Sequence, residues 1–136
     1  MQDAGLKGGS LLSYKDLDIY KLGHKLAVEV HKMTIKDLPR FELYEEGSQL
    51  RRSSKSIVVN VVEGFGRRRY KQEFIQFLTY SLASCDETKE HIEFLFDTGS
   101  LKNRLQFEYF LSGYEELGAK IYKFIRAVET RHLSRR

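Results

Sequence analysis

The chain has 136 residues, a net charge of +4 and a single cysteine, Cys85. Its 41% hydrophobic and 31% charged residues are typical of one folded domain and exclude a disordered chain. One cysteine excludes an internal disulfide framework and a thiolate-rich zinc site, and it favours a reducing, cytoplasmic location. No apolar run approaches the roughly 18 residues that span a bilayer, so we expect no contact with a membrane.

The N-terminal region is predicted to be a lead-in followed by a helix. Residues 1–13 are rich in glycine and lack the apolar core of a signal peptide, so we expect a flexible segment there. An apolar stripe at three- and four-residue steps then predicts a helix over about residues 16–34, and Pro39 prevents its continuation. The stripe consists of Ile19, Gly23, Leu26, Val30 and Met33.

A second helix is predicted from about Gln49 to Gly64 or Gly66. Both glycines suit the left-handed conformation that often ends a helix. Glutamates before the helix place negative charge at the positive end of its dipole. The apolar face consists of Leu50, Ser54, Ile57, Val58, Val61 and Phe65, and the preceding glutamates are Glu42, Glu45 and Glu46.

Two longer helices complete the chain. The third is predicted over about residues 71–98, closed by Gly99, with bulky residues at both ends of its seam and small ones in the middle. The fourth is predicted over about residues 103–132. The seam of the third helix is Phe74, Phe77, Leu78, Ser81, Cys85, Thr88, Ile92 and Leu95; that of the fourth is Phe107, Phe110, Leu111, Tyr114, Leu117, Ile121, Phe124, Ile125 and Val128.

These four helices, joined by short connections, predict an all-α fold. Neighbouring long helices with short loops pack antiparallel, which gives an up-down-up-down four-helix bundle over residues 14–132. Residues 133–136 are predicted to be a basic tail.

A polar line runs beside the apolar face of the second helix. Ser56, Asn60 and Glu63 follow one another at steps of four and three residues. They could form a polar site that contacts RNA or a partner. Alternatively, they form a structural network with Ser84 and Glu87 of the third helix, which is the interpretation we favour because buried polar groups need partners.

Positive charge gathers around the second helix and the turn after it. Seven cations stand there against one carboxylate, Glu63, and Tyr70 adds a ring on which a base could stack. The pattern indicates a phosphate-binding surface, or else an ordinary solvated face. A second cluster follows at the end of the fourth helix. The seven candidates for nucleic-acid binding are Arg51, Arg52, Lys55, Arg67, Arg68, Arg69 and Lys71; the second cluster is Lys120, Lys123, Arg126, Arg131, Arg135 and Arg136.

The third helix carries the opposite charge. Five carboxylates stand there against Lys89. Opposite charges on different surfaces of one subunit suit a head-to-tail contact between copies, which can close into a ring. These carboxylates are Asp86, Glu87, Glu90, Glu93 and Asp97.

The sequence offers no convincing catalytic or metal-binding pattern. His24 and His31 share a helix face without a carboxylate at ligand spacing, and a single Glu129-x-x-His132 is half of a di-iron motif at most. Gly64-Phe65-Gly66 lacks the strand and third glycine of a dinucleotide fingerprint. Cys85 in a helix seam favours a buried small residue over an activated thiol. We therefore expect no enzyme activity, no cofactor and no metal.

Several short motifs nevertheless carry a family resemblance. Gln49-Leu50-Arg51-Arg52, Ser56-Ile57 and Asn60-Val61-Val62-Glu63-Gly64 resemble the signature of the bacterial ribosomal-RNA intervening-sequence proteins, the S23-like four-helix-bundle family. Leu38-Pro39 with Glu42, and Ser84 with Glu87, extend the resemblance to about residues 14–128. The chain departs from the pattern at Lys55 and Val59, where small apolar residues or proline are more usual.

The resemblance implies a homopentameric ring of four-helix bundles with a basic surface. It also implies a likeness to the accessory variability determinant of diversity-generating retroelements, which binds nucleic acid and a reverse transcriptase. We accordingly expect a non-enzymatic oligomer that binds RNA or DNA, or an RNA-associated partner such as a reverse transcriptase. The alternative is a protein–protein scaffold without a nucleic-acid role.

Overall fold

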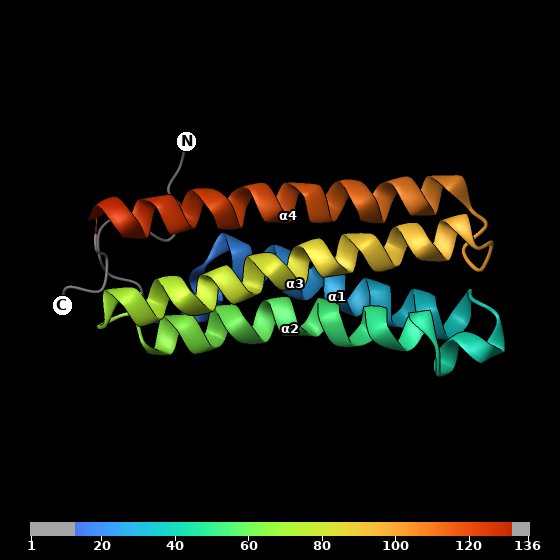
Figure 1. Cartoon of the computed structure of the whole chain (residues 1–136), viewed down its shortest axis with the longest axis horizontal. Coiled ribbons are helices and arrows are strands. Elements are labelled where there is room, and N and C mark those ends of the chain that lie inside the picture. Colours follow the sequence, from blue (N-terminus) through green and yellow to red (C-terminus); the bar gives the residue numbers. More distant parts are fainter. Residues whose placement is uncertain (1–12, 132–136) are drawn as a thin grey trace.

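A computed structural model describes residues 13–131 and contains four long helices (Figure 1). A short 3₁₀ turn, η1 (Tyr14–Asp16), precedes α1 (Asp18–Lys36), and a second, η2 (Arg40–Leu43), leads into α2 (Glu46–Gly66). The chain continues with α3 (Lys71–Asp97) and α4 (Arg104–Arg131). The predicted tail and all but one residue of the predicted lead-in lie outside the described residues.

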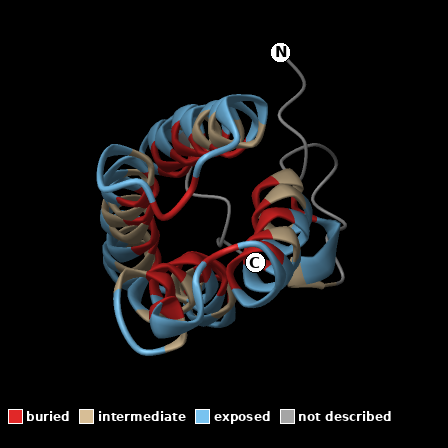
Figure 2. Ribbon diagram, turned by 90° about the vertical axis from the view of Figure 1, so that its right-hand side faces the viewer, coloured by how far each residue is buried: buried red, intermediate tan, exposed pale blue. Residues whose placement is uncertain are grey.

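The helices form the antiparallel four-helix bundle that their patterning predicts. Each helix packs on its neighbours in chain order, α4 returns to α1, and α1 and α3 lie on a diagonal. Figure 2 shows the buried residues gathered on the inward faces of all four helices. Among the residues described, no element is a β-strand.

The predicted apolar stripes form the core. All five stripe residues of α1 and all six of α2 are buried, and in α3 the seam is buried except for half-buried Phe77. In α4, half-buried Phe107 and Leu111 accompany an otherwise buried seam. The largest fully buried side chains are Tyr114, Phe74, Leu17, Leu26, Leu50, Ile57, Leu78, Ile92, Leu95, Leu101, Leu117 and Ile121.

The start of α2 depends on a buried carboxylate. Glu42 is only 3% exposed; its Oε1 accepts the Gly47 backbone N–H at 2.8 Å and its Oε2 accepts the Ser100 hydroxyl at 2.6 Å. A Cβ on Gly47 would lie 2.5 Å from the Glu42 carbonyl oxygen, so the turn requires glycine there. Glu42 therefore binds a free N–H at the helix start, which is more specific than the predicted dipole effect.

The glycine prediction at the other end of α2 is wrong in its conformation. Gly64 is a buried helical residue, and only Gly99 has a positive φ (87°) among the glycines that the structure describes. The cap of α2 is Arg67, with φ −108° and ψ 17°. Gly64 serves packing instead: a Cβ there would lie 3.2 Å from the Phe77 Cβ of α3. Gly99 follows the end of α3, as predicted.

Candidate nucleic-acid interface

The predicted basic cluster divides into two groups along α2. Arg51, Arg52 and Lys55 lie in the middle of the helix, whereas the other four cations lie at its end and at the start of α3. Lys55 and Arg67 are twelve positions apart, so the two groups are about 18 Å apart along the axis at 1.5 Å per residue. The seven cations therefore do not form one continuous patch.

Two arginines of the middle group are engaged within the bundle. The Arg51 guanidinium donates to the Thr34 hydroxyl at 2.8 Å and to the Leu43 carbonyl at 2.7 Å, which ties α2 to the end of α1 and to η2. Arg52 forms an ion pair with Glu87 of α3 at 2.5 Å. Both side chains thus have structural partners.

Lys55 differs because its partner carries no negative charge. Its Nζ lies 3.0 Å from Nδ1 of His31. Burial lowers the pKa of His31, and the nearby charges of Lys55 and Arg51 lower it further. The imidazole is therefore neutral at pH 7, and its ring nitrogen can accept the lysine N–H.

The second group forms a tight turn between α2 and α3, here named the arginine turn and consisting of Arg67, Arg68, Arg69, Tyr70 and Lys71. Backbone hydrogen bonds from Arg67 to the Gly64 carbonyl at 2.9 Å, and from Tyr70 to the Arg67 carbonyl at 2.8 Å, fix its shape.

Two arginines of this turn are held in place by neighbouring groups. Arg67 pairs with Glu63 at 2.6 Å and lies over the Phe77 ring, 4.5 Å from its centroid. Arg68 lies 4.1 Å over the Phe65 ring and donates to the Phe65 carbonyl at 2.9 Å. Stacking of this kind orders a guanidinium without neutralising it.

Arg69 and Tyr70 project from the turn into solvent. Arg69 is exposed and forms no ion pair within the described residues, and Tyr70 is 59% exposed. The antiparallel topology brings the last turns of α4 to the same end of the bundle (Figure 1). Cations from two elements therefore gather there. Those of α4 whose side chains the structure describes are Lys120, Lys123 and Arg126.

The residues of the predicted polar network do not form a single network. Ser56 and Ser84 join α2 to α3 through their hydroxyls at 2.9 Å, and the Asn60 amide donates to the Ser56 carbonyl at 2.9 Å. Glu63 does not reach them, because it pairs with Arg67. Glu87 belongs to a different set: it pairs with Arg52 and with His91 Nε2 at 3.0 Å, and the other ring nitrogen of His91 contacts Glu46.

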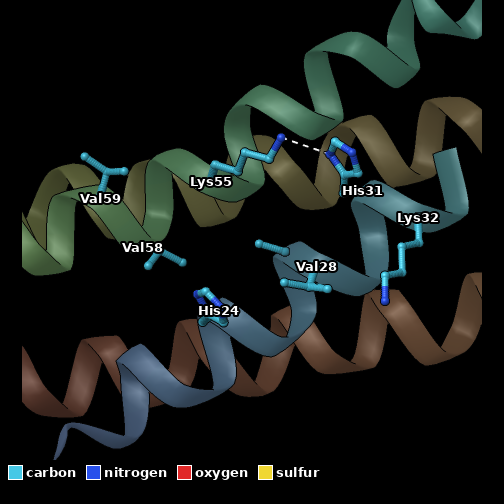
Figure 3. A pocket seen from close by; sticks show the side chains of 8 residues that line it. His24, Val28, His31, Lys32, Lys55, Val58 and Val59 are labelled. Carbon is cyan, nitrogen blue, oxygen red and sulfur yellow. Dashed lines mark hydrogen bonds between the residues drawn. The ribbon is translucent and has the colours of Figure 1, made fainter. Parts of the chain in front are cut away.

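A groove between α1 and α2 has no counterpart in the sequence analysis (Figure 3). It has a volume of about 480 Å³, its walls are largely apolar, and a lysine stands on each helix. The spacing of His24 and His31 with Val28 between them was the available sequence signal, but the groove exists only because α2 supplies the second wall. Its lining residues are His24, Ala27, Val28, His31, Lys32, Lys55, Val58 and Val59.

Nothing in the described part of the chain indicates catalysis. Cys85 is buried, donates to the Tyr114 carbonyl at 3.2 Å, and has a pKa raised to about 12 by burial, so its thiol is inert at neutral pH. Residues 13–131 contain no group of three or more His, Cys, Asp or Glu that could hold a metal ion. His132 of the di-iron half-motif lies outside the described residues. No described helix combines the length and the apolar character needed to cross a membrane.

The sequence matches a known protein family, and the fold matches a solved structure. Residues 15–123 match the model of a family described as 23S rRNA-intervening sequence protein. The chain belongs to this family. A crystal structure of a protein of unknown function from the S23 ribosomal protein family of Bacteroides thetaiotaomicron shares the fold, with a TM-score of 0.70 at 22% identity, over 79% of this chain and 95% of that one. None of the curated proteins matches.

Proposed function

We propose that this member of the 23S rRNA-intervening sequence protein family is a non-enzymatic, self-associating bundle that binds RNA through its arginine turn. The observation that carries the proposal is the pair of Arg69 and Tyr70, a cation that forms no ion pair among residues 13–131, beside a 59% exposed aromatic ring. Phosphate attracts the guanidinium, and an unpaired base can stack on the ring.

The rest of the turn supports the same function. Arg68 is already ordered on Phe65, so a phosphate contact there would cost little side-chain entropy. Lys71 begins α3 beside it, and the cations of α4 lie at the same end of the bundle (Figure 1). A backbone fixed by hydrogen bonds presents these groups together.

The middle of α2 fits this function less well. Arg51 is engaged by Thr34 and Leu43, and Arg52 by Glu87, so a phosphate would have to displace existing partners. We therefore assign the RNA contact to the arginine turn, and we expect Arg51 and Arg52 to act mainly on stability.

The test is binding of a structured 23S rRNA fragment across a salt series, with Arg69→Ala compared with Arg52→Ala. Each lost phosphate contact should lower the slope of log K against log salt by about 0.7 to 0.9, so Arg69→Ala should lose that amount and Arg52→Ala should not. Tyr70→Ala should weaken binding by about 1 to 3 kcal/mol without changing the slope. Salt-independent binding, or equal effects of both arginine variants, would overturn the proposal.

A pure protein–protein scaffold is the second candidate, and the groove between α1 and α2 favours it. The triple variant Arg67→Glu/Arg68→Glu/Arg69→Glu separates the two functions. RNA binding lost from an intact oligomer supports the RNA function, whereas collapse to a monomer in light scattering supports the scaffold.

A further inference from the structure

The groove between α1 and α2 presents positive charge that no carboxylate within the described residues compensates. Lys32 stands on the α1 wall and Lys55 on the α2 wall (Figure 3), and none of the eight lining residues is acidic. The hydrogen-bond partner of Lys55 among the described residues is the neutral His31, whereas Lys25, Arg52 and Arg67 each pair with a glutamate.

The floor and walls between these lysines are apolar and open. Val59 is 54% exposed and Val28 is 39% exposed, and Ala27 and Val58 also line the groove. An apolar groove flanked by two unpaired cations fits an apolar side chain that carries carboxylates around it.

The outward face of α3 has this opposite arrangement. Phe94 is 49% exposed, and Glu90, one turn before it, and Asp97, one turn after it, are its neighbours on the helix surface. Glu93 lies farther round the same side of the helix. Within the described part of the chain none of the three forms an ion pair. We name this surface the acidic knob; it consists of Phe94, Glu90, Glu93 and Asp97.

We infer that the α1–α2 groove of one copy receives the acidic knob of a second copy. The inference rests on the self-association proposed above and names its contact. Phe94 would fill the space between Val28 and Val59, and the surrounding carboxylates would reach Lys32 and Lys55.

The two surfaces can meet only between copies. α1 and α3 lie on a diagonal of the bundle, and the knob faces outward from α3, so one chain cannot close the contact on itself. Because the surfaces differ, the association is head-to-tail: each copy uses its groove on one side and its knob on another. This leaves the arginine turn, at the end of the bundle, free for RNA.

The aromatic side chain and the charges have separate tasks. A buried aromatic anchor supplies most of the affinity at interfaces of this kind, while complementary charges on the rim set orientation and association rate. Phe94→Ala should accordingly weaken association more than any single charge change does.

The test is sedimentation velocity of the full chain without nucleic acid over a concentration series. The groove variant is Lys32→Glu/Lys55→Glu, the knob variant Glu90→Lys/Glu93→Lys, and circular dichroism checks that each keeps its helix content. The matched controls are Lys15→Glu/Lys21→Glu, the same charge change at two exposed positions outside both surfaces, and Leu105→Ala, an exposed apolar residue outside both surfaces.

We expect the wild type and both controls to self-associate with similar strength. The groove variant, the knob variant and Phe94→Ala should each lose about tenfold or more in association constant, and an equimolar mixture of the groove and knob variants should regain association because the reversed charges again match. That recovery is the decisive result, since variants that merely misfold cannot produce it.

Three outcomes would overturn the inference. A wild-type chain that stays monomeric at high concentration removes both this contact and the proposed self-association, and leaves the groove to another protein or a small amphiphile. Association that survives the groove and knob variants places the contact elsewhere and retains self-association. Loss in both variants without recovery in the mixture shows that the two surfaces do not bind each other.

Discussion

The α2–α3 and α1–α4 interfaces close the same bundle by different means. Between α2 and α3, buried hydroxyls meet: Thr88 donates to Ser53 at 2.8 Å, and Ser81 donates to the Ile57 carbonyl at 2.8 Å. Between α1 and α4, the polar contacts are exposed, as in Tyr109, which accepts from Lys25 at 3.0 Å and donates to Glu29 at 2.7 Å.

The difference determines how strictly each interface fixes the alignment of its two helices. Small side chains let α2 and α3 approach closely, and each directional hydrogen bond forms in only one alignment of the two helices. Across α1 and α4, the flexible ends of leucine side chains lie against glycines: Leu26 against Gly113 and Leu117 against Gly23. We therefore expect the first interface to tolerate little change in volume and the second to adapt.

Ser81→Leu should give the largest effect. Ser81 is fully buried and bonded to the Ile57 carbonyl, so three extra carbons would force α2 and α3 apart and remove this hydrogen bond between the helices. We expect a loss of about 3 kcal/mol in the free energy of unfolding, measured by urea denaturation. Ser112→Leu, on the exposed face of α4, is the matched control and should change stability by less than about 0.5 kcal/mol.

Alanine at Gly64 and at Gly113 compares the two interfaces directly. A Cβ on Gly64 would meet the Phe77 Cβ at 3.2 Å and the Phe74 carbonyl oxygen at 3.4 Å, atoms fixed close to the backbone. A Cβ on Gly113 would meet the end of the Leu26 side chain at 2.9 Å, which can rotate.

In thermal unfolding, Gly64→Ala should cost about 1 to 2 kcal/mol. Gly113→Ala should fall within about 0.5 kcal/mol of neutral, since improved helix propensity offsets the shift of Leu26. Equal losses would mean that α1 and α4 are as rigidly packed as α2 and α3.

Acid should lower the free energy of unfolding by a smaller amount, because it protonates Glu87 at the exposed edge of the α2–α3 interface. The hydrogen bond from His91 lowers the pKa of Glu87 below its ordinary value, and Arg52 lowers it further. A depressed carboxyl pKa stabilises the fold above the unfolded-state value near 4.5, and the contribution disappears as pH falls through the folded-state value.

The expected stability difference between the wild type and Glu87→Gln at pH 7 is below about 1 kcal/mol, because the pair is exposed. It should shrink in urea titrations as the pH falls below 4.5, the ordinary pKa of the glutamate side chain. Glu115→Gln, an exposed glutamate that forms no ion pair among residues 13–131, should show no such trend. A Glu87 difference independent of pH would contradict the ionic explanation.

Periodicity predicted the inward faces because burial of an apolar stripe follows directly from helix geometry. The small residues at the middle of the α3 seam, such as Ser81 and Thr88, also predicted that another helix packs closely there. The sequence could not indicate that Gly64 serves packing rather than termination, since that role depends on where Phe77 of another helix lies.

The candidate site was less predictable. The seven cations around α2 looked like one cluster along the sequence, but helix rise separates Lys55 from Arg67, and tertiary contacts engage Arg51. The groove forms between two helices, so neither Val28 on α1 nor Val59 on α2 could predict it from the sequence alone. Distances between elements, rather than residue types, decided these outcomes.

The two hydrogen bonds of Glu42 affect how the bundle unfolds locally. By binding Gly47 with one oxygen and Ser100 with the other, its carboxylate fastens the α1–α2 connection to the α3–α4 connection. Amide exchange at the two connections should therefore be governed by one shared opening event. At the opposite end of the rod, no side chain among the described residues joins two connections in this way, so local opening there need not loosen the end that Glu42 holds.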